Sequence, residues 1–90
     1  MIQYEIKVTG RVQGVWFRRF SQEKAGILGI KGWVKNTPDG NVTIVAQGEK
    51  KDLETFLDYL KIGPPRARVD KIIWSEIQGL GDFNNFNVRC

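Results

Sequence analysis

The stretch IKGWVKNTPDGNVTIVAQ, residues 30–47, predicts two adjacent strands joined by a tight turn. Val42, Ile44 and Ala46 alternate with the polar residues Asn41, Thr43 and Gln47 except at position 45, which is typical of a strand with one face in a core. Residues 37–40, Thr-Pro-Asp-Gly, combine a proline that pre-sets φ with a glycine that tolerates positive φ. We therefore expect strands over 30–36 and 41–47 that pair as a hairpin.

Helical patterns lie on both sides of this hairpin. Upstream, Phe17, Ala25 and Leu28 share one face of a helix of about three turns. Downstream, residues 49–63 carry large apolar side chains at helical spacing and end at a glycine followed by prolines. Further strands are expected over residues 4–8, 69–77 and 86–89.

The resulting order of elements is β-α-β-β-α-β, with the last strand in two pieces. Two β-α-β units with right-handed crossovers interleave into one sheet that carries both helices on the same face. We therefore predict a ferredoxin-like α+β sandwich with a four- to five-stranded antiparallel sheet. At 90 residues, 41% of them hydrophobic, the chain can bury a single core, so residues 1–90 are expected to form one domain.

The composition limits both the expected cellular location and the groups available for catalysis. No apolar run approaches the ~20 residues that cross a bilayer, and the start MIQYEIK shows no signal-peptide pattern, so we expect a cytoplasmic protein without a membrane partner. A monomer is expected for a chain of this size with no apolar seam. The formal charge of +4 favours anions. The chain has no histidine, which removes the commonest general base and metal ligand, and the single cysteine, Cys90, allows no cysteine metal cluster. No metal and no cofactor are expected.

Between the first strand and the first helix lies GRVQGVWFRR, residues 10–19. Gly10 and Gly14 permit a tight turn, and the first amides of a helix have no intrahelical partner. Together with the helix dipole and one guanidinium, these amides could bind an oxyanion such as phosphate. A glycine turn followed by surface arginines explains the same residues equally well, because such short patterns are weak.

If the loop does bind phosphate, its residues argue against two classes of enzyme. A P-loop NTPase needs Gly-Lys-Ser/Thr, whereas residues 15–17, Val-Trp-Phe, follow Gly14. A cysteine phosphatase carries its nucleophile at the start of the loop that leads to the arginine, and counting back from Arg18 places Val12 there. Water is then the expected nucleophile, and without imidazole the substrate must bring a good leaving group. A carboxylic-phosphoric anhydride does so, because a carboxylate with a pKa near ~4 leaves unprotonated.

The same loop resembles the acylphosphatase signature, in which Gly, a basic or variable residue and Val-Gln-Gly-Val precede a variable residue, an aromatic residue and Arg. The stretch LGIKGWVKNTPDGNV, residues 28–42, resembles the second signature of that family, Gly-Trp-Val-x-Asn before a hairpin turn. The segments GPPRARVDKI and FNVR also resemble family members in the same order. The resemblance therefore covers essentially the whole chain.

This resemblance implies a hydrolase that splits acyl phosphates into a carboxylate and inorganic phosphate, without metal, cofactor or covalent intermediate. By motif position, Arg18 binds the substrate phosphate and Asn36 positions the nucleophilic water. The phosphate-binding loop then comprises Gln13, Gly14, Val15, Trp16, Phe17 and Arg18, mostly through backbone amides. Inorganic phosphate, the product, is expected to compete with the substrate.

The residues themselves agree in part with these assignments. Arg18 and Arg19 lie about 100° apart on a helix, so only one can reach over the loop, and Arg19 is expected to be solvated. By its position beside a turn alone, Asn36 would be a turn residue, and only the signature makes it catalytic. For Trp16, packing over the site is favoured over shaping the acyl end of the substrate.

Two rival functions share the predicted fold. A single-stranded RNA-binding module would carry stacking aromatics on the third strand, and residues 41–45 offer none. An accessory domain that had lost activity would have replaced Arg18 or Asn36, and both are present. The expected partner is therefore a small-molecule acyl phosphate, with no nucleic acid.

Overall fold

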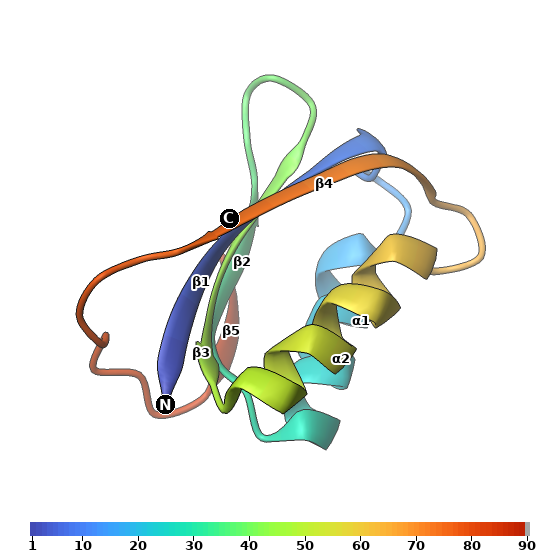
Figure 1. The fold of residues 1–90 in the computed structure, drawn as a ribbon. Helices are drawn as coiled ribbons and strands as arrows, with labels where there is room; N and C mark the ends of the chain where they lie inside the picture. Colours follow the sequence, from blue (N-terminus) through green and yellow to red (C-terminus); the bar gives the residue numbers. More distant parts are fainter. Residues whose placement is uncertain (90) are drawn as a thin grey trace.

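The computed structural model describes residues 1–89 and shows two helices packed on one face of a five-stranded sheet (Figure 1). The elements are β1 (Ile2–Arg11), α1 (Phe17–Leu28), β2 (Lys31–Asn36), β3 (Val42–Gly48), α2 (Lys50–Ile62), β4 (Arg68–Glu76) and β5 (Phe86–Arg89). The predicted order of elements is confirmed, including the division of the last strand. Within residues 1–89, neither helix combines the length and the apolar character that a membrane span requires.

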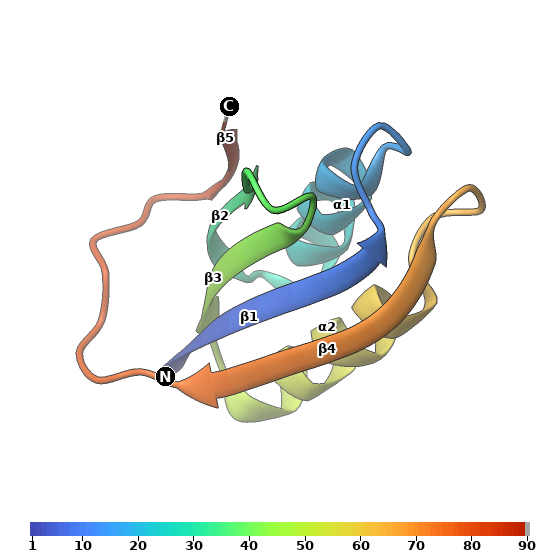
Figure 2. The same cartoon turned by 90° about the horizontal axis from the view of Figure 1, so that it is seen from above.

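The strands lie in the order β4-β1-β3-β2-β5. All neighbours are antiparallel except β2 and β5, which run parallel, with Gly32 opposite Phe86. The expectation of a wholly antiparallel sheet is therefore wrong at this edge. After β4, residues 77–85 pass around one end of the sheet to its far edge (Figure 2). Because β2 begins at that same end, β5 starts beside it and runs in the same direction.

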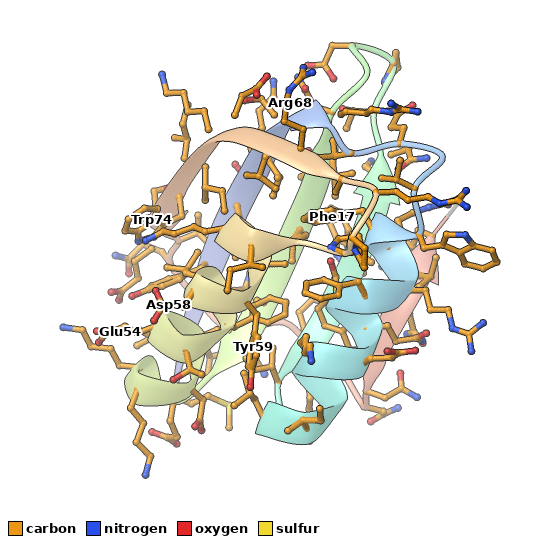
Figure 3. All side chains as sticks on the ribbon, turned by 90° about the vertical axis from the view of Figure 1, so that its right-hand side faces the viewer. Phe17, Glu54, Asp58, Tyr59, Arg68 and Trp74 are labelled. Atoms are coloured by element: carbon orange, nitrogen blue, oxygen red, sulfur yellow. The ribbon has the colours of Figure 1, made fainter. Side chains whose placement is uncertain are left out.

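The core lies between the sheet and the helices. Ile6, Val8 and Ile44 point to this side of the sheet and form one fully buried cluster with Phe56 of α2. Each such side chain stabilises the fold by about 1.5–3 kcal/mol relative to an exposed one. Phe17, at the start of α1, belongs to the same buried cluster (Figure 3). The start of α1 is thereby held at a defined place against the sheet.

The first strand is longer than predicted. It continues to Arg11, with an irregularity in its pairing to β4 between Thr9 and Gly10. Gly10 has a φ of 130°, and a Cβ there would lie 2.1 Å from the carbonyl oxygen of Arg68. Gly10 therefore permits close strand pairing, and the expectation that it forms the turn before the helix is wrong. Of the two glycines, only Gly14 lies in the β1–α1 connection.

A second close approach predicts a strong effect of mutation at Gly32. Its φ is 140°, and a Cβ there would lie 1.9 Å from the carbonyl oxygen of Val45. We expect Gly32→Ala to lower the free energy of unfolding by about 2–3 kcal/mol, because the backbone of β2 or β3 must shift. The matched control is Gly26→Ala in α1, where nothing lies within 4 Å of the added Cβ and alanine should stabilise by about 0.5–1 kcal/mol. Urea unfolding measures both, and similar stabilities would contradict the close approach.

Candidate active site

A concave site of about 440 Å³ lies where the β1–α1 connection meets β2 and β5. Its lining consists of Val12, Gly14, Trp16, Phe17, Arg18, Arg19, Asn36 and Val88. The site thus joins most of the predicted loop residues to Asn36, which comes from a different strand. None of the lining residues carries a carboxylate, and two carry guanidinium groups, so the site suits an anionic ligand. Its volume fits a small molecule.

The loop backbone takes two left-handed conformations just before α1. Gly14 has a φ of 71°, and Trp16, which precedes the first helical residue, has a φ of 68°. For a residue other than glycine this conformation costs on the order of 1 kcal/mol. Trp16 is the N-cap of α1, and its side chain makes no hydrogen bond to the first amides of the helix. Those amides, at the positive end of the helix dipole, remain available to an anion.

The two arginines of the loop have different partners. Arg18 Nη1 donates a hydrogen bond of 2.9 Å to the carbonyl oxygen of Arg89 in β5. That acceptor is neutral, and within residues 1–89 Arg18 belongs to no ion pair, so its positive charge is not compensated. Arg19 instead pairs with Glu23 at 3.2 Å and lies over the ring of Trp16. Its side chain is 68% exposed, as expected for a solvated arginine.

Asn36 brings a half-buried side chain with a buried amide oxygen to the site. It ends β2, just before the hairpin turn. Its Oδ1 is buried and has no hydrogen-bond partner within residues 1–89. A buried acceptor without a partner costs about 1–3 kcal/mol and calls for a specific explanation, such as a bound water. The Asn36 side chain as a whole is half-buried and lines the site, and a carboxamide can both donate hydrogen bonds to water and accept them, so this position is suited to orienting a water molecule.

Two residues of the predicted loop do not line the site. Gln13 Nε2 donates hydrogen bonds of 2.8 Å to the carbonyl oxygens of Thr37 and Asn41. Val15 is buried in the core, with 3% of its surface exposed. The Gln13 side chain therefore connects the loop to the β2–β3 hairpin, and the Val15 side chain holds the loop against the core. Only their backbone groups can contribute to an anion site.

The hairpin that follows Asn36 is also held by an ion pair. Asp39 accepts hydrogen bonds from the Thr37 hydroxyl and from the backbone N–H of Asn41, the latter at 3.2 Å. It pairs with Lys7 Nζ of β1 at 2.9 Å. The Lys7 ammonium, followed by the Thr37 hydroxyl, holds the pKa of Asp39 well below its usual range. The β2–β3 hairpin turn is thereby tied to β1, the strand on the other side of β3.

This ion pair predicts a loss of stability in acid. The pKa of Asp39 is lower in the folded protein than in the unfolded chain, where it is near 3.8. The carboxylate therefore stabilises the fold fully when the pH is above 3.8, and this contribution is lost as the pH falls through the pKa of the folded protein. Wild type should therefore exceed Asp39→Asn in urea midpoint at neutral pH, and the two should converge as the pH falls below about 4. Salt should reduce the difference because the pair is exposed. The control Glu54→Gln changes an exposed carboxylate on α2. A difference for Asp39→Asn that stays constant with pH would contradict the ion pair's role.

Metal ligands do not gather in the described part of the chain. Among residues 1–89, no three side chains of His, Cys, Asp or Glu lie close enough together to hold a metal ion. The polar groups that meet in the site are guanidinium, backbone N–H and carboxamide groups, which are donors to anions or partners for water. The arrangement can therefore bind an oxyanion beside an oriented water molecule.

Sequence reasoning missed one part of the site. Val88 lines it, and the carbonyl oxygen of Arg89 holds Arg18, yet neither was predicted to take part. Both belong to β5, which reaches the site only because it pairs with β2. A backbone carbonyl is present at every residue, so no pattern in the sequence could have identified this one.

Comparison with known proteins identifies the family. The sequence model of the family described as Acylphosphatase matches residues 4–88. An acylphosphatase of Thermus thermophilus is 51% identical over 79 residues, covering 86% of this chain and 90% of the relative, and one of Methylococcus capsulatus is 42% identical over 88 residues, covering 98% and 96%. A crystal structure of acylphosphatase from Bacillus subtilis, 41% identical, matches with a TM-score of 0.97 over all of both chains. The chain therefore belongs to the acylphosphatase family.

Proposed function

We propose that the chain is an acylphosphatase that hydrolyses the carboxyl-phosphate bond of small acyl phosphates by direct attack of water. The observation that carries this proposal is that one concave site brings together Arg18, which has no ion-pair partner within residues 1–89, the helix-start amides and Asn36, whose Oδ1 is buried. The names of the relatives, which are acylphosphatases, support the substrate class. The products are a carboxylate and inorganic phosphate.

In this proposal Arg18 and the loop bind the phosphoryl group. A guanidinium offers parallel N–H donors to two phosphate oxygens, and the amides of residues 14–17 lie at the positive end of the α1 dipole. The hydrogen bond from Arg18 to the Arg89 carbonyl keeps the guanidinium in place before the substrate arrives. Hydrogen-bond donors that are already in place around the transferring phosphoryl group stabilise its transition state. Each such donor typically raises kcat by a factor of about 10² to 10³.

Asn36 holds the nucleophilic water in line with the phosphorus. An amide is a poor base, so it orients the water, and the proton passes to an oxygen of the phosphate itself. The bond from the water oxygen to phosphorus forms as the bond from phosphorus to the acyl oxygen breaks, and that electron pair leaves with the carboxylate. A carboxylate with a pKa near ~4 needs no general acid to leave. The reaction therefore requires neither imidazole nor a covalent intermediate.

The alternative, an RNA-binding module, is not favoured. Such a module stacks bases on aromatics of the open sheet face, and the side chains that β3 presents there include Thr43 and Val45. Trp33 of β2 lies on this face, but Lys35 and Arg89 cover its ring, with their charged groups 5.3 and 4.6 Å from the ring centroid. The family assignment also favours the enzyme.

We also propose that the enzyme acts as a cytoplasmic monomer without metal or cofactor. A chain of 90 residues with a single cysteine and no histidine is consistent with this setting. Analytical ultracentrifugation tests the monomer, because a dimer would double the sedimenting mass.

The deciding experiment is hydrolysis of benzoyl phosphate in EDTA, with added inorganic phosphate as competitor. We expect turnover to persist in EDTA, and phosphate to raise KM without lowering kcat, because both ligands would occupy the same anion site. No turnover, or turnover only after a divalent metal is added, would contradict the proposed reaction.

A further inference from the structure

A second hollow adjoins the candidate active site and shares two of its residues. It has a volume of about 390 Å³ and is lined by Trp16, Arg19, Phe20, Glu23, Pro64 and Pro65. Trp16 and Arg19 also line the first site. Trp16 is 67% exposed, so it is not packed into the core as an ordinary apolar side chain would be. It lies between the two hollows and lines both of them.

The fold holds the walls of this hollow in place. A Cβ on Gly63 would lie 3.2 Å from the Phe17 ring, so α1 begins directly against the segment that follows α2 (Figure 3). The rings of Phe17 and Phe20 lie 6.1 Å apart, which places Phe20 one turn further along the same side of α1. Pro64 is buried, and its carbonyl oxygen accepts a hydrogen bond of 3.0 Å from the N–H of Ala67. The proline wall is therefore rigid and close to the start of α1.

The chemistry of the hollow is apolar and close to neutral. Trp16, Phe20 and the two prolines offer aromatic and aliphatic surface. The only charged lining residues, Arg19 and Glu23, pair with each other at 3.2 Å. Because these two charges are paired, the rim carries little net charge that could bind a charged ligand group. A group with its own carboxylate would therefore lose hydration without compensation on entering, whereas an uncharged apolar group would not.

We propose that this hollow binds the acyl group of the substrate, so that the enzyme prefers acyl phosphates with an aromatic or other uncharged apolar acyl group. The inference rests on the proposed function. A phosphoryl group bound at Arg18 carries its acyl substituent on one of its oxygens, and the first site shares the residues Trp16 and Arg19 with the second hollow. On the side bounded by Trp16 and Arg19, that substituent enters the second hollow. A ring placed there contacts the Trp16 indole and the prolines, which contributes hydrophobic and aromatic binding energy.

The test compares kcat/KM for benzoyl phosphate with kcat/KM for acetyl phosphate, which carry the same phosphoryl group. Trp16→Ala should lower the benzoyl-to-acetyl ratio about tenfold relative to wild type, chiefly through KM for benzoyl phosphate. Alanine, unlike glycine, does not loosen the left-handed backbone at this position. Trp16→Phe should keep most of the ratio, because it retains an aromatic face. Pro65 lies outside the phosphate-binding loop, and Pro65→Ala should lower the benzoyl-to-acetyl ratio about two- to threefold.

Trp74→Ala is the control, since Trp74 is an exposed tryptophan of β4 that lies beside α2 and lines neither hollow (Figure 3). It should change neither rate. An equal loss for both substrates in Trp16→Ala, with no change of ratio in Pro65→Ala, would overturn this inference and leave the proposed function standing. Failure of the wild-type chain to hydrolyse either substrate would instead remove the proposed function. Circular dichroism and urea midpoints show whether each variant is folded.

Discussion

Replacing Arg18 by glutamine is expected to lower kcat/KM for benzoyl phosphate by about 10³ or more. The charge of Arg18 is not compensated within the described residues, and its Nη1 already donates to the Arg89 carbonyl at 2.9 Å. Glutamine removes the charge and the fork of donors, whose bonds to phosphate strengthen as negative charge develops. Both kcat and phosphate affinity should fall. Steady-state kinetics and the inhibition constant of inorganic phosphate measure the two effects.

Three further variants separate the role of Arg18 from a general effect of charge. Arg18→Lys keeps the charge but loses the planar fork, so its activity should lie between wild type and Arg18→Gln. Arg19→Gln should cost only a few-fold, because Arg19 is already paired with Glu23. Arg66→Gln removes the same charge from an exposed loop residue outside the site and should be close to wild type. If Arg18→Gln retained a tenth of the parent rate, the phosphate-binding role would be wrong.

Replacing Asn36 by alanine is expected to lower kcat by a factor of about 10² to 10³ and to leave KM largely unchanged. The substrate phosphate would still be bound by Arg18 and the loop, while the water would lose its orienting group. The change should not destabilise the protein, because Asn36 Oδ1 is buried and has no partner within residues 1–89, so alanine removes no hydrogen bond made by that atom there. Steady-state kinetics and urea unfolding on the same preparation measure both predictions.

Asn41→Ala is the matched control for Asn36→Ala. Asn41 is an asparagine of the same hairpin, and it offers its backbone carbonyl to Gln13 and its backbone N–H to Asp39. Alanine keeps both backbone groups, so kcat should change little. Hydrolysis of benzoyl phosphate by Asn36→Ala at the parent rate would exclude water positioning. A lower urea midpoint for Asn36→Ala would show that the amide supports the fold.

The order of helices and strands could be predicted because it depends on local patterns. The alternation along β3 and the helical spacing in α2 show which side chains turn to a core, whatever that core contains. The parallel direction of β5 could not be predicted in this way. It depends on the path of residues 77–85 around the end of the sheet, and that path joins positions far apart in the chain.

The candidate site also contains residues that the sequence could identify and contacts that it could not. Arg18 and Asn36 could be named because each lies in a short signature whose residue types are specific. Gln13 was expected to contribute to the phosphate-binding loop through its backbone amide, and no partner was predicted for its side chain, which donates to the carbonyl oxygens of Thr37 and Asn41. Its acceptors are backbone atoms of another segment, which no residue pattern marks.

The sequence by itself determined the order of the elements, the membership of the family and the kind of chemistry that a chain without histidine can perform. Only the tertiary structure decided which of the two loop arginines pairs with a carboxylate within residues 1–89, that Oδ1 of Asn36 is buried with no partner among those residues, and that Trp16 lies between two hollows. The physical reason is that periodicity and signatures are properties of neighbouring residues. Charge pairing, burial and shared walls depend on which distant segments the packed core brings together.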